Sequence, residues 1–300
     1  MLVRPMGASS PFTAAGIVGA DLPMSMDSQG RLTLNIPPTE QPLEFLLLRC
    51  AGKSDAGHDD FLQLMTETYA SELPESPSAL TSGGPARWPM EFKTTGELGQ
   101  QKPYALDTIH LPESNPWNAW IRTSALDFFE NGDAAVSTYG GDIWIVSGID
   151  DELEEITWRR FAAGMFEPMG LKVVDGLVYV TCRDRIIRLH DLNQDGEADF
   201  YESFFADPDV SPNFHAFNFD LQQDAQGNLY YSKSGQYTDF HLPGAIMKVA
   251  PDGKSHEVYC TGLRTPNGMG MSPDGRPLVS DNQGNWIPAS KVSLTKEGGF

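Results

Sequence analysis

Short apolar runs separated by glycine-containing turns dominate the chain from Trp117 to Phe300. Four units of turn and strand recur: NGDAAVSTYGGDIWIVSG, VVDGLVYVTCRDRIIRLHD, DAQGNLYYSKSG followed by GAIMKVAPDG, and SPDGRPLVSDN. Glycine supplies the positive φ that tight hairpin turns need. The turns recur roughly every 40 to 50 residues, which is the length of a propeller blade. The pattern predicts an all-β fold, with a partial β-propeller of about four blades over residues 117–300. A β-sandwich is the main alternative.

The residues before Trp117 follow other patterns. Arg31–Ile36 alternates polar and apolar side chains, and Leu43–Arg49 is an apolar run typical of a buried strand. We interpret residues 1–75 as a fragment of a small β-rich domain. Residues 76–116 are rich in Pro, Ser, Gly and Thr over much of their length, which indicates a linker or docking segment.

Charge narrows the range of partners. The chain has 41 Asp and Glu against 21 Lys and Arg, a net charge of −20. Such a surface repels phosphate backbones and anionic lipids, so we expect no nucleic-acid partner and no insertion into a membrane. It suits a protein that binds neutral sugars or cations. The sequence shows no apolar run of about 20 residues and no signal peptide, and both ends read as internal to a longer protein.

The three cysteines, Cys50, Cys182 and Cys260, lie far apart and form no CxxC or CxxCH motif. These residues therefore hold no zinc ribbon and no c-type haem attachment. Cys182 and Cys260 lie in or beside apolar runs, and we expect buried thiols there.

Residues 191–202, with the sequence DLNQDGEADFYE, match the calcium-loop pattern D-x-[DN]-x-[DN]-G-x5-E. Calcium prefers six to eight oxygen ligands at flexible geometry. The predicted ligands are Asp191, Asn193, Asp195, the carbonyl of Glu197, Asp199 and Glu202. The run RIIRLH before the loop reads as a strand, so we expect a structural calcium between propeller strands rather than an EF-hand. The alternative is an acidic turn held by Asx hydrogen bonds alone.

Several stretches resemble the propeller of large secreted multidomain proteins of planctomycetes, the membrane-bound dehydrogenase family. They are GLKVVDGLVYVTCRDRIIRLHDLNQDGEADFYE, FHAFNFDLQQDAQGNLYYSKSG and TGLRTPNGMGMSPDGRPLVSDNQGNWIPASKV. The segments GGPARWP, PYALDTIHLPESNPWNAW and TWRRFAAGMFEPMGLK resemble the region that precedes that propeller. The resemblance covers residues 83–300 and implies a periplasmic or secreted location.

That family is similar to the quinoprotein glucose/sorbosone dehydrogenases, which use pyrroloquinoline quinone (PQQ). The resemblance implies that His215 is the general base, taking a proton from a sugar hydroxyl while hydride leaves the same carbon for the quinone. It implies that Arg264, followed by Asn267 in the same turn, contacts the quinone. Thr265 stands where the family has Asn, and the Gly-Gly pair after the family His is missing. Relatives often carry a c-type haem domain downstream, which would accept the electrons.

The resemblance implies a sugar or alcohol dehydrogenase module, and two other functions remain open. One is a non-catalytic propeller that binds carbohydrate or protein, and the other is a calcium-dependent lactonase-like hydrolase. His215 and Arg264 favour the dehydrogenase, whereas the altered R-T-P-N turn favours the scaffold. Each residue also has a structural reading, His215 as a cap on a carbonyl and Arg264 as a bridge between blades. Asp281, Asn282 and Trp286 form a polar and aromatic loop that suits either sugar stacking or packing at a blade edge.

Overall fold

The computed structural model describes residues 2–4, 12–29, 31–52, 63, 67, 76–234, 241–284 and 288–300. The chain divides into two compact units, Met1–Ser82 and Gly83–Phe300. The domain bounds expected from the sequence stay a prediction. No helix among the described residues is both long and apolar enough to cross a membrane.

The first unit contains short antiparallel strands. One sheet has the order β1-β2-β5, and β3 pairs with β4 in a hairpin. The bounds are β1 Leu2–Arg4, β2 Phe12–Val18, β3 Met24–Met26, β4 Leu32–Leu34 and β5 Leu46–Gly52, followed by the 3-10 helix η2 Pro77–Ser82. Strands β4 and β5 confirm the two strands predicted around Arg31–Ile36 and Leu43–Arg49. The apolar run of β5 is not buried as predicted, since Leu47 is 57% exposed. The Asp27 carboxylate fixes the β3–β4 turn by accepting the Arg31 N–H at 2.8 Å.

The second unit contains four antiparallel sheets, which are the blades of a partial propeller. Blade 1 is β9 Thr123–Phe128, β10 Ala134–Thr138, β11 Ile143–Ser147 and β12 Ile156–Ala162, extended by β6 Glu91–Thr94. Blade 2 is β13 Gly170–Val174, β14 Leu177–Thr181, β15 Arg185–His190 and β16 Phe200–Ala206. Blade 3 is β17 Asn218–Gln223, β18 Leu229–Lys233, β19 Ile246–Val249 and β20 His256–Cys260. Blade 4 has β21 Pro266–Met271, β22 Pro277–Asp281 and β23 Lys291–Leu294. A small hairpin of β7 Gly96–Glu97 and β8 Thr108–Ile109 completes the unit.

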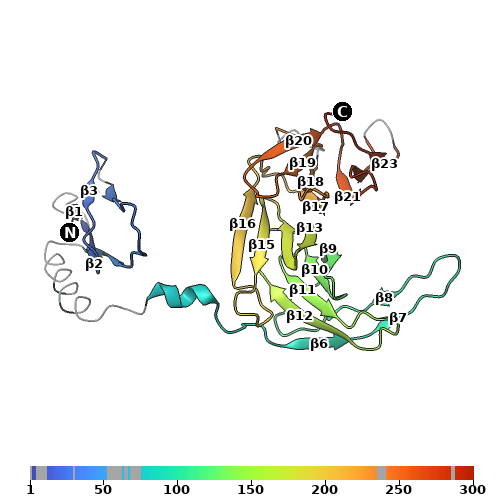
Figure 1. Ribbon diagram of the computed structural model, residues 1–300, viewed down its shortest axis with the longest axis horizontal. Helices are drawn as coiled ribbons and strands as arrows, with labels where there is room; N and C mark the ends of the chain where they lie inside the picture. The colour runs from blue at the N-terminus through green and yellow to red at the C-terminus, as the bar shows by residue number, and fades with distance from the viewer. Residues whose placement is uncertain are drawn as a thin grey trace. The chain divides into compact units, whose positions relative to one another are not determined.

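The first strands of the blades lie side by side on the inner side of the propeller. Strand β9 contacts β13, β13 contacts β17, and β17 contacts β21, as the order of the blades in Figure 1 shows. These inner strands all run in the same direction, because each blade begins at its inner edge and returns antiparallel. The arrangement confirms the all-β propeller prediction and excludes the two-layer sandwich.

Glycines at equivalent positions close the first hairpin of every blade. Gly132, Gly176, Gly227 and Gly275 have φ of 91°, 78°, 86° and 80°. A side chain at such φ is strained, so glycine is the favoured residue. These are the turns that the repeated sequence motifs predict.

Apolar clusters fill the spaces between neighbouring blades. Val180 and Leu189 pack with Ile143 between blades 1 and 2, and further clusters join blade 2 to 3 and blade 3 to 4. Cys182 and Cys260 are free thiols buried in these clusters, as predicted. The other face of blade 1, around Trp144 and Trp158, is covered by residues from the segment before β9, including Phe92, Ile109, Leu111 and Trp117.

Candidate functional site

The end of the propeller at which the inner strands begin is built by one hydrogen bond repeated in every blade. In each case a residue after the second strand donates its backbone N–H to the carbonyl of a residue just before the inner strand. The donor and acceptor pairs are Tyr139 and Arg122 (2.9 Å), Arg183 and Phe166 (3.0 Å), Ser234 and Phe217 (3.0 Å), and Asn282 and Thr265 (3.4 Å). We call this end, formed by these eight residues and the loops before the inner strands, the mouth.

Polar side chains from two blades meet at the mouth. The Tyr139 hydroxyl donates to Glu167 Oε1 at 3.0 Å, and Arg183 Nη1 donates to Glu167 Oε2 at 2.6 Å. Burial raises the pKa of Tyr139, and the hydrogen bond to Glu167 raises it further, because both disfavour the phenolate. Tyr139 is therefore a permanent donor near neutral pH. Glu167 has φ of 46°, in the left-handed region that is uncommon for a residue other than glycine.

Aromatic rings surround this polar group. The Arg183 guanidinium lies over Phe217 at 5.1 Å and over Phe166 at 5.7 Å. The Tyr139 and Phe217 rings are 6.2 Å apart in an edge arrangement. Side chains from blades 1, 2 and 3 thus converge, and a ligand at the mouth would meet a tyrosine hydroxyl, a carboxylate and a guanidinium among rings.

His215 lies in the loop that enters the inner strand of blade 3. Its N–H donates to Asn213 Oδ1 at 3.0 Å, and its exposed ring is 4.0 Å from that of Phe214. The carbonyl of Asn213 accepts a hydrogen bond from Arg183 Nη2, which ties the His215 loop to the polar group of the mouth.

Buried charged side chains also fix the segment that leads into this loop. Lys233 is fully buried, and its Nζ donates to Asp207 Oδ2 at 2.7 Å and to the Asp209 carbonyl at 2.6 Å. Asp207 Oδ2 also accepts from Tyr231 Oη and from Asn218 Nδ2. A buried lysine requires such partners, because an unpaired charge is costly to desolvate. These hydrogen bonds therefore fix the start of residues 207–215, the segment that carries His215.

Arg264 enters the inner strand of blade 4 at the same end of the propeller. The N–H groups of Arg264 and Thr265 donate to Asp281 Oδ1 at 3.1 and 2.9 Å, so Asp281 fixes this turn. Among the described residues no carboxylate contacts the Arg264 guanidinium. Asn267 is exposed in β21. The structure thus brings the loops of His215 and Arg264 to one end, and Trp286 lies outside the described residues.

Comparisons with known proteins give matches among solved structures alone. No family model matches the chain, and none of the curated proteins matches it significantly. The PQQ-bound aldose sugar dehydrogenase of Streptomyces coelicolor is 16% identical, with a TM-score of 0.48 over 60% of this chain and 61% of that one. The soluble aldose sugar dehydrogenase of Escherichia coli is 12% identical, with a TM-score of 0.47 over 59% and 61%. Virginiamycin B lyase of Staphylococcus aureus is 12% identical, with a TM-score of 0.40 over 69% and 60%.

These likenesses concern the fold. The chain spans about three fifths of the length of the first solved structures that it matches. Any activity has to be argued from the side chains of this chain.

The predicted calcium loop lies at the outer edge of blade 2, after the end of β15 that is remote from the mouth. Asp191 Oδ1 and Oδ2 accept the N–H groups of Asp195 and Gly196 at 3.1 and 2.8 Å. Asn193 Oδ1 also accepts from Asp195 N–H, and Asp195 Oδ1 from Glu197 N–H, each at 3.0 Å. Within the described ranges, no three His, Cys, Asp or Glu side chains are grouped as metal ligands. The calcium site stays a prediction.

The loop also binds the segment that leads into blade 1. Glu197 Oε2 accepts the N–H groups of Arg87 and Trp88 at 2.5 and 2.9 Å, and Asp199 Oδ1 accepts from Gly84 N–H at 3.1 Å. Glu197 is 7% exposed, so these hydrogen bonds are sheltered from water.

Glu202 lies in β16, where it has partners on the neighbouring strand. Arg188 Nε donates to Glu202 Oε2 at 2.7 Å, and His190 Nε2 is 2.7 Å from the same oxygen. The hydrogen bond from Arg188 lowers the pKa of Glu202. The Glu202 carboxylate therefore contacts side chains of β15 and does not join the oxygens of the loop.

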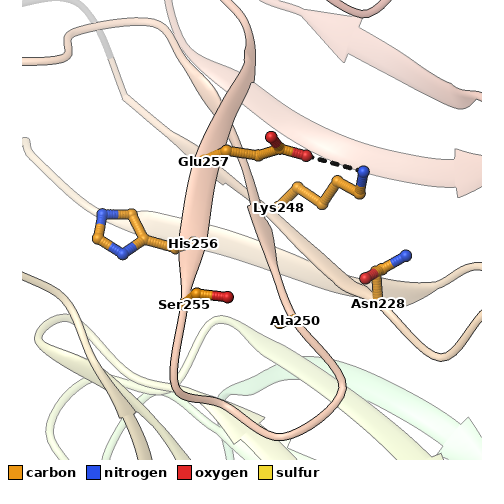
Figure 2. A pocket seen from close by; sticks show the side chains of 6 residues that line it. All are labelled: Asn228, Lys248, Ala250, Ser255, His256 and Glu257. Atoms are coloured by element: carbon orange, nitrogen blue, oxygen red, sulfur yellow. Dashed lines mark hydrogen bonds and ion pairs between the residues drawn. The ribbon is translucent and has the colours of Figure 1, made fainter.

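A separate groove of about 190 Å³ lies on blade 3. Figure 2 shows the Lys248 and Glu257 side chains meeting across it, with an Nζ–Oε1 distance of 2.8 Å, while the His256 ring points to the other side. None of the residues that the sequence singles out lines this groove, and its lysine is already paired.

The sequence patterns miss the polar residues that meet at the mouth, Tyr139, Glu167 and Arg183. They do not form a motif, because they lie more than ten residues apart and meet through the packing of two blades. A signal was nevertheless present: Tyr139, Arg183, Ser234 and Asn282 all closely follow the second apolar run of their units.

Proposed function

We propose that the chain is a sugar or alcohol dehydrogenase module that passes electrons to a bound quinone. The supporting observation is the placement of His215 and Arg264 in equivalent loops of adjacent blades, both at the mouth. A base and a carboxylate-binding cation at one end of a propeller are what hydride transfer to an acidic quinone needs.

The residues present fit PQQ, which carries carboxylates. Arg264 would hold a carboxylate through its planar fork, since no carboxylate among the described residues contacts it, in a chain of net charge −20. Asn267, exposed near the start of β21, would add an amide. When bound, the quinone supplies the two-electron acceptor.

The chain's own residues would position the substrate and move the proton. His215 takes the proton of the reacting hydroxyl on its imidazole, which lies 4.0 Å from the Phe214 ring. The Glu167 carboxylate and the oxygen of the Tyr139 hydroxyl, whose proton is donated to Glu167, offer acceptors to the other hydroxyls of a sugar. The rigid anchoring of the loop through Lys233 keeps the base in place.

The proposal extends beyond the mouth. A calcium ion at Asp191–Asp199 would be structural, because the loop is remote from the mouth. A c-type haem domain of the full-length protein would accept the electrons, and the protein would be periplasmic or secreted.

A second proposal is a carbohydrate-binding scaffold without catalysis. Its support is the exposure of rings near the inner-strand starts, with Phe214 75% and Trp120 71% exposed. Such rings stack on the apolar faces of sugars.

Dye reduction by the full-length protein, with aldoses and sugar alcohols in the presence of PQQ and calcium, separates the two proposals. We expect quinone-dependent turnover that His215→Ala reduces by at least about a hundredfold, the usual worth of a general base. His110→Ala, an exposed histidine remote from the mouth, is the matched control and should keep full activity. Sugar binding without quinone-dependent turnover would favour the scaffold.

A further inference from the structure

Arg122 stands directly before the inner strand of blade 1. Its carbonyl accepts the Tyr139 N–H of the mouth, and its own N–H donates to the Trp120 carbonyl at 3.0 Å. This tight turn holds the Trp120 and Arg122 side chains together on a rigid part of the blade.

Two rings support the Arg122 guanidinium. It lies 4.9 Å from the centre of the Tyr139 ring and 5.5 Å from that of Trp120. An arginine held over aromatic faces keeps its planar fork and loses little freedom when it binds. Tyr139 is itself fixed by its hydrogen bond to Glu167, so the support is preorganised.

No carboxylate neutralises Arg122 among the described residues, although the chain has 41 acidic residues to 21 basic ones. Arg183, the other arginine close to Tyr139, is paired with Glu167. Arg122 is therefore an exposed and uncompensated cation at the mouth, beside an indole that is 71% exposed.

We propose that Arg122 and Trp120 form a binding site for the carboxylate of a small ring-bearing ligand. The guanidinium donates two parallel hydrogen bonds to the carboxylate, and the indole covers the apolar face of the ring. The net charge of −20 disfavours polymeric anions such as nucleic acid, so we take the ligand to be a small acid. Two sources share this chemistry, a sugar acid as substrate and the quinone cofactor, because each presents a ring to the indole and a carboxylate to the guanidinium. The choice of ligand rests on the proposed function, whereas the binding test below does not depend on it.

Binding titrations of the full-length protein with glucuronate, glucose and PQQ test the inference, using Arg122→Gln and Trp120→Ala. We expect Arg122→Gln to weaken glucuronate binding roughly tenfold or more and to leave glucose binding unchanged. Trp120→Ala should weaken both sugars, and it should fold because the indole is largely exposed. Arg87→Gln removes another exposed arginine, remote from the mouth, and should change nothing.

The outcomes separate the two sources. A loss of affinity confined to PQQ in Arg122→Gln assigns the carboxylate to the cofactor. Equal affinities of the wild type and Arg122→Gln for both acids would overturn the inference, as would a wild type that binds neither acid. Absence of quinone-dependent turnover, together with glucuronate binding that depends on Arg122, would refute the dehydrogenase and leave the carboxylate site standing.

Discussion

Replacing Asp220 with asparagine removes a charge from the middle of an inner strand and keeps the shape of the side chain. Asp220 lies at an irregularity in the pairing of β17 with β18, and its φ of 59° is one that asparagine tolerates well. Its N–H donates to the Met169 carbonyl of blade 2 at 3.0 Å. The substitution therefore tests charge with little change in backbone conformation.

The magnitude follows from the environment of the carboxyl group. Burial raises its pKa from 3.8 to about 6, and a hydrogen bond from the Met269 N–H opposes the rise. A shift of about 2 pKa units corresponds to roughly 3 kcal/mol. Because the folded protein holds the proton more tightly than the unfolded chain, stability is complete below about pH 4 and falls as pH rises through about 6.

Urea unfolding of the wild type and Asp220→Asn between pH 4 and pH 8 measures this effect. We expect the variant to be more stable than the wild type at pH 8, by up to roughly 3 kcal/mol, and the difference to vanish near pH 4. Asp175→Asn is the matched control, since Asp175 is exposed and has a φ of 49°. A difference for Asp220→Asn that does not change with pH, or a variant that is less stable at pH 8, would refute the reasoning.

Three further predictions concern packing and the calcium loop. Gly170→Ala should lower the unfolding free energy by about 1–3 kcal/mol, because a Cβ there would overlap the Asp220 carbonyl. Gly270→Ala, in the inner strand of blade 4 with no atom near the added Cβ, should lower it by less than about 1 kcal/mol. Equal losses for the two variants would contradict this reasoning. Glu197→Ala should destabilise the folded protein by about 1–3 kcal/mol and speed amide hydrogen exchange at Arg87 and Trp88, because their two N–H groups lose their acceptor. Unchanged exchange at these two residues would count against this prediction. If calcium binds Asp191–Asp199, a chelator should lower the melting midpoint and added calcium should restore it; a midpoint insensitive to both would mean that the loop needs no ion.

The blades were predictable because their signal is local. A glycine turn between two apolar runs specifies a hairpin within about fifteen residues, as around Gly132 and Gly275. The packing of the segment before β9 against blade 1 was not predictable from such a local signal. Strand β6 pairs with β12, so Phe92 lies opposite Trp158, and a polar segment gives no sign of so distant a partner.

The candidate site was likewise predictable only where its residues belong to a local sequence motif. The sequence pointed to the loops of His215 and Arg264, and the topology places both at the mouth. The Tyr139, Glu167 and Arg183 group depends on the packing of blades 1 and 2, which no single stretch of sequence encodes. The spacing of Asp191–Glu202 suggested one ligand set, yet the Glu202 carboxylate pairs with Arg188 because a strand begins within the motif.

Equilibrium titration of the full-length protein with PQQ is the most direct test of a quinone site at the mouth. We expect saturable binding that Arg264→Gln weakens roughly tenfold or more and that Arg87→Gln leaves unchanged. Equal affinity of the wild type and Arg264→Gln, or no saturable binding by the wild type, would contradict the assignment.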